Sequence, residues 1–255
     1  MPRKLFSETF GILEFLNDGP LAGESSMKNR VVLVTGANGG LGTAVTRKFL
    51  SDGATVVGMA RKISSADFPS PNFTGISADL TQSAGVDGAV SSVVNRFGGI
   101  DVLAHVVGAF AGGKIAETDD ATWAQMADLN LNSAFYVLRA AIPHLRKSGA
   151  GRIIAIGSLA AMEPHAGIGA YVTFKSALTM LVRTVAQENQ DAGVTANVIL
   201  PGTMDTPGNR KAMPNADPAK WLQPTEVADL AYWLASESAG HLTAATLPID
   251  GRAAP

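Results

Sequence analysis

The sequence predicts an α/β fold in which a doubly wound parallel sheet of about seven strands carries helices on both faces. Strand-like and helix-like stretches alternate from residue 30 onward. The strand-like stretches include short continuous apolar runs, such as residues 31–34, which are typical of parallel strands buried on both faces. No repeat and no second domain follows. Alternating units of this kind form one sheet between two helical layers.

Each element is predicted from its local pattern. The expected strands cover residues 31–34, 54–57, 73–78, 100–104, 152–156, 195–199 and 245–249. The expected helices cover residues 40–51, 82–97 and 119–146, then a stretch that carries Tyr171 and Lys175, and a last helix that begins near Pro224. Residues 200–217, between the sixth strand and the last helix, are rich in proline and glycine and are expected to form a loop.

Composition excludes several classes of protein. Of the 255 residues, 46% are hydrophobic and 16% are charged, which indicates a globular chain rather than a disordered one. The net charge of −2 gives no basic surface for nucleic acid. Cysteine is absent, so disulfides and thiolate sites are excluded. No cluster of metal-binding residues is present, and no apolar run approaches the roughly 18 residues of a membrane span.

The first 26 residues are predicted to lie outside the main domain, which is expected to cover residues 27–255. Their basic start resembles a secretory leader only faintly, because Glu8 and Glu14 interrupt the apolar region. One interpretation is a non-catalytic extension, partly disordered, with Met27 as the natural beginning. The alternative is an amphipathic arm that packs on a neighbouring subunit.

Tyr171 and Lys175 form the most informative pair in the sequence. Residues four apart share one face of a helix, so the phenol and the ammonium group are expected to lie together. A free tyrosine has a pKa of about 10, and a neighbouring cation lowers it. Ser158 stands thirteen positions before Tyr171 and offers a hydroxyl group that can hold a substrate oxygen.

A glycine-rich turn follows the first strand. Its sequence is Thr-Gly-Ala-Asn-Gly-Gly-Leu-Gly, residues 35–42, and a helix is expected to begin there. Glycines let the backbone approach a pyrophosphate, and the helix N-terminus supplies N–H groups and a positive dipole. The spacing differs from the common G-x-G-x-x-G pattern, so on its own this turn is equally consistent with a tight turn that binds nothing.

Taken together, these motifs resemble the classical short-chain dehydrogenase/reductase family, from about residue 28 to residue 252. The pattern Thr-Gly-x-x-x-Gly-x-Gly is followed in order by Ser158, Tyr171 and Lys175. Four further segments match the family: Asp79-Leu80, Leu129-Asn130-Leu131, the segment from Pro201-Gly202-Thr203 to Thr206, and Ile249-Asp250-Gly251. The resemblance implies a Rossmann fold, a nicotinamide dinucleotide cofactor, a cytoplasmic location, and a homotetramer or homodimer built through the two long helices.

The resemblance also assigns roles to residues. Tyr171 would act as the acid/base, Lys175 would lower the pKa of Tyr171 and bind the nicotinamide ribose, Ser158 would polarise the carbonyl, and Asn130 would anchor a water of a proton relay. The cofactor would be bound by Gly36, Asn38, Gly39, Gly40, Leu41, Gly42, Arg61, Asp79, Leu80, Gly108, Tyr171, Lys175, Pro201, Gly202, Thr203 and Thr206.

Two departures from the family pattern bear on function. The usual Asn-Asn-Ala-Gly after the fourth strand is His105-Val106-Val107-Gly108, and His105 is expected to be a packed, hydrogen-bonded residue without a catalytic role. The position that holds an acid in NAD enzymes is Ala60, and Arg61 follows it. An arginine there accommodates a 2′-phosphate, so NADP(H) is the expected cofactor, with NAD(H) as the alternative.

The expected activity is the reduction of a ketone or 3-oxo compound to an alcohol. The loop at residues 200–217 and the segment around Phe110 also resemble quinonoid dihydropteridine reductases, which form the runner-up. A nucleotide-sensing regulator without catalysis is the alternative from another class. The loop residues 209–211 carry charge for an anionic substrate or for solvation. Two interpretations stay open, an apolar pocket or ordinary core packing, for Phe110, Met162, Met204, Met213 and Trp221.

Overall fold

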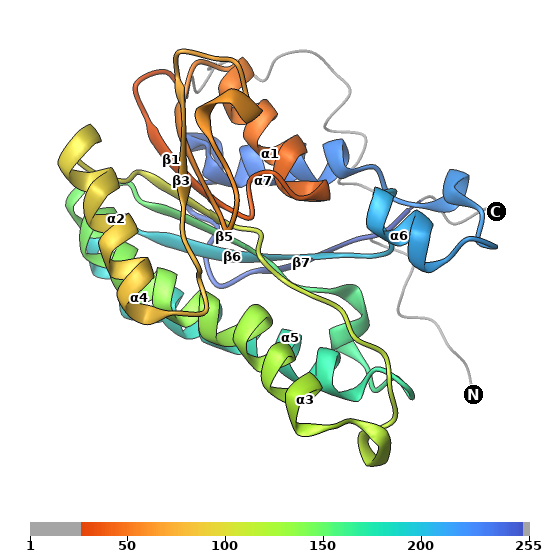
Figure 1. The fold of residues 1–255 in the computed structure, drawn as a ribbon. Helices are drawn as coiled ribbons and strands as arrows, with labels where there is room; N and C mark the ends of the chain where they lie inside the picture. The colour runs from red at the N-terminus through yellow and green to blue at the C-terminus, as the bar shows by residue number, and fades with distance from the viewer. Residues whose placement is uncertain (1–26, 252–255) are drawn as a thin grey trace, which may run out of the picture.

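The structure, a computed structural model, describes residues 27–251, so the predicted extension at residues 1–26 lies outside the described residues. One seven-stranded sheet runs through the centre in the order β3-β2-β1-β4-β5-β6-β7 (Figure 1). All neighbouring strands pair in parallel. The strands are β1 Val31–Thr35, β2 Thr55–Ala60, β3 Phe73–Ser77, β4 Val102–His105, β5 Arg152–Ile156, β6 Thr195–Pro201 and β7 Thr246–Ile249.

Helices cover both faces of this sheet, as the alternating pattern predicted. Helices α1 and α7 pack together on one face, and α2, α4 and α5 lie on the other (Figure 1). The helices are α1 Gly40–Ser51, α2 Ser83–Phe97, α3 Asp120–Ala127, α4 Ser133–Lys147, α5 Gly169–Glu188, α6 Pro207–Ala212 and α7 Pro224–Ala235. The doubly wound prediction is therefore confirmed.

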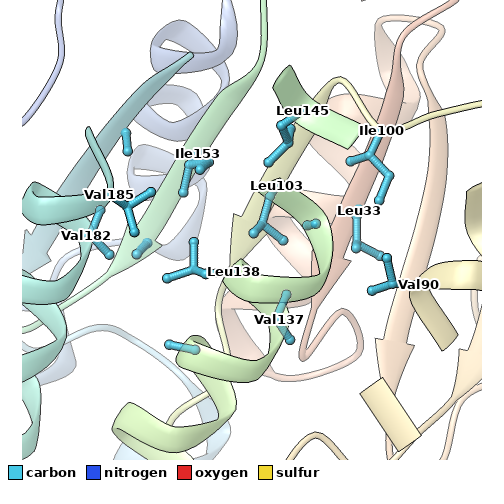
Figure 2. Packing of buried hydrophobic residues seen from close by; sticks show 14 of the residues in the cluster. Leu33, Val90, Ile100, Leu103, Val137, Leu138, Leu145, Ile153, Val182 and Val185 are labelled. Carbon is cyan, nitrogen blue, oxygen red and sulfur yellow. The ribbon is translucent and has the colours of Figure 1, made fainter. Parts of the chain in front are cut away.

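Alternate residues of the central strands feed two separate cores. Leu33 of β1 points to the side of α2 and α4, whereas its neighbours Val32 and Val34 point to the side of α1 and α7. Figure 2 shows Leu33, Leu103 and other apolar side chains of the first core between the strands and the helices. Strands that are buried on both faces need apolar residues at every position, which explains the continuous apolar runs in the sequence.

The predicted single helix at residues 119–146 is interrupted. Helix α3 ends at Ala127, a π-helical turn covers Asp128–Asn132, and α4 begins at Ser133. The side-chain amide of Asn130 donates to the carbonyl oxygen of Met126 at 3.1 Å. Asn130 lies within the π-helical turn, and such turns are frequent at functional sites.

The predicted loop at residues 200–217 contains one short helix. Pro207 opens α6, and the hydroxyl oxygen of Thr206 accepts a hydrogen bond from the Asn209 N–H at 3.2 Å. Proline at the first position and threonine at the N-cap are both favoured at a helix start. The composition predicted a loop because the helix is too short to show a period.

The sheet order places a crevice between β1 and β4. The chain leaves these neighbouring strands toward opposite faces, and ligands of open α/β sheets bind at the carboxyl ends of the strands at such a point. Within residues 27–251, no helix has the length and apolar character needed to cross a membrane. The same residues contain no group of three side chains suited to a metal ion.

Candidate active site

Ser158, Tyr171 and Lys175 come together at the carboxyl end of β5. The Lys175 ammonium donates to the carbonyl oxygen of Ile156, the last residue of β5, at 2.8 Å. Ser158 follows two positions later, and its hydroxyl group interacts with the phenol of Tyr171. Because Tyr171 and Lys175 are one helical turn apart on α5, both side chains face this strand end.

Burial dominates the electrostatics of this group. It raises the pKa of Tyr171, while the interaction with Ser158 acts in the opposite direction. It also lowers the pKa of Lys175 to about 8. The net direction expected for the pKa of Tyr171 is therefore reversed in this geometry, because removal of the phenol from water outweighs the interaction with Ser158. The Lys175 ammonium is bonded to the Ile156 carbonyl, and its effect on the phenolate stays a prediction.

Asn130 fixes the loop that follows β4. Its side-chain oxygen accepts from the Ala109 N–H at 3.1 Å, and its amide donates to the Ala109 carbonyl at 3.0 Å. The second amide hydrogen goes to Met126. With both hydrogens used, the side chain of Asn130 positions the loop, and its role in holding a water of the expected relay stays a prediction.

Gly108 allows this loop to approach the lysine. A Cβ atom at Gly108 would lie 2.8 Å from the Lys175 nitrogen and 3.0 Å from the Asn130 side-chain oxygen. No residue with a side chain fits there without displacing one of these two groups. Gly108 therefore belongs to the same arrangement as Lys175 and Asn130, although the sequence assigned it only to the cofactor.

His105 is a packed, hydrogen-bonded histidine, as expected. Its Nδ1 atom forms a hydrogen bond with the Thr35 hydroxyl group at 3.1 Å, and the oxygen of that hydroxyl group accepts from the Val106 N–H at 3.1 Å. The side chain is 1% exposed, and burial together with the Lys175 charge lowers its pKa to about 3. His105 is neutral at physiological pH and links the ends of β1 and β4.

The glycine-rich turn has the geometry of a phosphate cradle. Gly36 adopts a φ of +67°, and a Cβ atom at Gly42 would lie 1.9 Å from the Gly36 carbonyl oxygen. Gly39 is the N-cap of α1 and offers no side-chain cap, and Leu41 turns its side chain into the core. The first-turn N–H groups of α1 thus remain available to an anion, so these residues fit a dinucleotide pyrophosphate.

The other expected cofactor residues follow β2 and β3, the strands on one side of β1. Arg61 is exposed directly after β2, and the Asn38 amide donates to the neighbouring Lys62 carbonyl at 2.7 Å. Asp79 is exposed after β3 and its carboxylate accepts from Thr81, whereas Leu80 is buried. These residues lie at the carboxyl ends of the strands, on the side where an adenosine would extend from the pyrophosphate.

The segment after β6 closes the other side of the crevice. A Cβ atom at Gly40 would lie 2.9 Å from the Thr206 methyl group, so α1 and this segment are in contact. Pro201 is the buried last residue of β6, and the Thr203 carbonyl accepts from the Leu222 N–H at 2.9 Å. Gly202 lies against the carboxylate of Asp250, where no side chain would fit.

The loop residues 209–211 are mostly engaged within the loop. The Arg210 guanidinium forms a two-bond ion pair with Asp205, with Nη2 at 2.8 Å from the carboxylate. The Asn209 amide donates to the Met204 carbonyl at 2.8 Å. The interpretation of this segment as a grip for an anionic substrate therefore loses two of its three side chains.

The five residues of the expected apolar pocket differ in how far they are buried. Phe110, Met162 and Met213 are exposed by 64%, 57% and 37%, whereas Met204 packs on the core and Trp221 is partly buried. Phe110 lies edge-to-face with Tyr171, with 5.1 Å between the ring centroids. The Ile156 carbonyl is a functional group that the sequence could not reveal, because backbone atoms carry no residue signal.

The comparisons with known proteins agree with this geometry. The family model described as short chain dehydrogenase matches residues 30–217. The chain is 33% identical over 243 residues to 2,5-dichloro-2,5-cyclohexadiene-1,4-diol dehydrogenase LinX of Sphingobium indicum, covering 88% of this chain and 96% of that one. It is 27% identical to the 3-oxoacyl-[acyl-carrier-protein] reductase FabG of Vibrio cholerae, covering 89% and 98%.

A solved structure shows the same fold. The aldohexose dehydrogenase of Thermoplasma acidophilum, in ligand-free form, aligns with a TM-score of 0.82 and 28% identity, covering 89% of this chain and 94% of that one. The match of a family model to most of the chain and the seven-stranded doubly wound sheet lead to one conclusion. The chain belongs to the short-chain dehydrogenase/reductase family of oxidoreductases, which use NAD(P)(H).

Proposed function

We propose that this protein is an NADP(H)-dependent carbonyl reductase, which converts a ketone or 3-oxo compound to an alcohol. The observation that carries the proposal is the meeting of Ser158, Tyr171 and Lys175 at the end of β5, beside the glycine cradle. The three relatives named above are, by their names, a diol dehydrogenase, a 3-oxoacyl-[acyl-carrier-protein] reductase and an aldohexose dehydrogenase. All three names refer to conversion between an alcohol and a carbonyl group, but each names a different kind of substrate.

The residues divide the chemistry as follows. Ser158 holds the substrate oxygen and Tyr171 donates a proton to it. Because burial raises the pKa of Tyr171, the phenol is protonated at neutral pH, which suits reduction. Lys175 lies one turn away and stabilises the phenolate that remains after the transfer. The bound nicotinamide supplies the hydride.

The preference for NADP(H) rests on the end of β2. The strand ends at Ala60, and Arg61 and Lys62 follow it as exposed cations. The bond from Asn38 holds this loop against the glycine turn, where a ribose 2′-phosphate would meet Arg61. We expect Arg61→Ala to raise the KM for NADPH about tenfold and to leave the KM for NADH nearly constant. A wild-type enzyme that prefers NADH would overturn this part of the proposal.

A carbonyl panel tests the activity itself. Oxidation of NADPH is followed by absorbance with ketones, 3-oxoacyl thioesters, quinones and quinonoid dihydropterin. We expect turnover with a ketone or a 3-oxo compound, whereas turnover with the pterin alone would favour the dihydropteridine reductase activity. A cofactor-induced rise in Tm without oxidation of any compound would instead indicate a nucleotide-sensing protein.

Three further expectations accompany the proposed activity. We propose that residues 27–255 form the catalytic domain, that residues 1–26 are an extension, and that the protein works in the cytoplasm. We also propose a homotetramer or homodimer, in which the outer faces of α4 and α5 meet partner subunits. Phe135 on α4 and Met180 on α5 are 43% and 59% exposed, which supports an interface there. Light scattering of the purified protein measures its mass, and a monomer would overturn this proposal.

A further inference from the structure

Phe110 lies at the mouth of the candidate active site with most of its ring exposed. The side chain is 64% exposed, and its ring packs edge-to-face with the phenol of Tyr171 at 5.1 Å between centroids. A single exposed phenylalanine is ordinary at a protein surface. Phe110, however, contacts Tyr171, the expected proton donor. Its ring can therefore also contact a group bonded to the carbonyl that Tyr171 protonates.

The loop that carries Phe110 is fixed at both ends. Before it, the side chain of Asn130 bonds both the N–H and the carbonyl of Ala109. After it, the Gly113 N–H donates to the Gly167 carbonyl at 2.7 Å, and Gly113 pairs with Ile168 as an isolated bridge. Phe110 is therefore held beside Tyr171 by backbone contacts rather than placed there by a free loop.

The loop that carries Phe110 has no charged side chain between Val106 and Gly113. Residues 106–113 read Val-Val-Gly-Ala-Phe-Ala-Gly-Gly, without one polar side chain. Ala109 and Ala111 pack with Tyr171 on the small apolar cluster of Met126, Ala170 and Phe174. Ile115, 60% exposed, lies against Gly169 at the start of α5, where a Cβ atom would be 2.5 Å from its Cδ1 atom. This wall favours apolar groups.

We propose that Phe110 is a specificity-determining residue that selects carbonyl compounds bearing a flat apolar ring next to the reacting carbon. The inference rests on the proposed carbonyl reductase activity and names the substrate class of that site. The ring of such a substrate packs on the exposed part of Phe110, and this contact brings its oxygen to Tyr171 and Ser158. Contacts between two aromatic rings add to the gain from burial, so a flat ring benefits more than a flexible chain.

Two ketones with equal numbers of carbon atoms test the proposal: acetophenone, which has a phenyl ring, and methyl hexyl ketone, which has a flexible chain. We expect wild-type kcat/KM to favour acetophenone. Phe110→Ala lowers kcat/KM for acetophenone about tenfold, mainly through KM, and lowers that for methyl hexyl ketone less than about threefold. Phe110→Leu, which keeps apolar bulk without a flat face, falls between wild type and Phe110→Ala with acetophenone only.

A binding measurement separates this inference from the proposed activity. Calorimetry follows the binding of 1-phenylethanol to wild type and to Phe110→Ala, each saturated with NADPH, which cannot oxidise the alcohol, and the Tm of each variant checks folding. We expect the variant to bind this alcohol about tenfold more weakly, with the affinity for NADPH and the Tm preserved.

The outcomes are distinct. If both ketones lose activity equally in Phe110→Ala, or if wild type has no preference for the ring, the assignment of Phe110 is overturned. If wild type reduces neither ketone but the variant binds the alcohol more weakly, the proposed activity fails on these ketones while the ring-binding role of Phe110 stands. Equal binding of the alcohol by both proteins sinks the role of Phe110.

Discussion

The cofactor side and the substrate side of the crevice differ in whether backbone or side chains define their shape. On the cofactor side, backbone defines the shape, since Gly36, Gly40 and Gly42 leave no room for side chains and α1 presents uncapped N–H groups. On the substrate side, side chains define the shape, and Phe110 and Ile115 stand exposed beside Tyr171 and the start of α5.

This difference explains why the cofactor side carries the sequence motifs of the family, whereas the substrate side determines which substrate binds. Backbone geometry tolerates few residues, so a cofactor cradle leaves a recognisable pattern in sequence. Exposed side chains can be exchanged without loss of the fold, so the substrate side is free to differ between relatives. Changes on the two sides should therefore have separable effects on cofactor binding and on turnover.

The largest expected effect is on the substrate side. Tyr171→Phe removes the proton donor and keeps the ring that packs on Phe110. We expect kcat to fall about 1,000-fold, because general acid catalysis contributes roughly 10²–10⁴-fold. Stopped-flow turnover measures kcat, and fluorescence titration of NADPH is expected to give an unchanged Kd. Near-normal turnover would remove Tyr171 from the mechanism.

The next effect should be confined to the cofactor side. Gly42→Ala places a Cβ atom 1.9 Å from the Gly36 carbonyl oxygen, so the turn must move. We expect the Kd for NADPH to rise at least about tenfold, measured by the same titration. The matched control is Gly88→Ala in α2, where a Cβ atom meets nothing within 4 Å. If both variants bind NADPH equally well, the cradle is not the binding site.

Lys175 lies where the two sides meet, and its burial predicts a gain in stability when it is replaced. The folded pKa of about 8 lies below the ordinary 10.5, so the charged form costs stability below pH 8 and this cost vanishes as pH rises to 10.5. We expect Lys175→Met to be about 2 kcal/mol more stable at pH 7, after loss of the Ile156 bond is included.

Urea unfolding at several pH values measures this difference. The advantage of Lys175→Met over wild type should shrink between pH 8 and pH 10, because wild type then loses its buried charge. Turnover should be lost in the variant at every pH. If the variant is instead less stable than wild type at pH 7, the contacts of the ammonium stabilise the fold by more than its burial destabilises it.

His105 should produce a smaller effect, seen only in acid. Its folded pKa of about 3 lies below the ordinary 6.5, so its contribution is complete above pH 6.5 and is lost as pH falls toward 3. We expect the free energies of unfolding of wild type and His105→Asn to differ by about 2 kcal/mol less at pH 5 than at pH 7. Parallel pH profiles of the two proteins, measured by urea unfolding, would contradict a buried neutral imidazole.

The predictions from sequence agree best with the structure where the backbone conformation restricts which residues can occur. The strand runs, the glycine turn and the start of α1 were predicted within a few residues, because buried parallel strands and phosphate cradles restrict residue choice. The interruption of the helix at residues 128–132 was missed, because a single π-helical turn is too short to show a period in the sequence. The contact of Asn130 with Ala109 was missed because the two residues are distant in sequence. The pKa direction of Tyr171 was missed because spacing shows the neighbouring lysine but not the burial.

The most direct test of the account follows a deuterium atom. NADPH that carries deuterium on the transferring face of the nicotinamide is incubated with acetophenone and the enzyme, and mass spectrometry locates the label. The account predicts one deuterium on the former carbonyl carbon with wild type, and formation of the same labelled alcohol about 1,000-fold more slowly with Tyr171→Phe. Equal rates of labelling by both proteins, or an alcohol without deuterium, would contradict it.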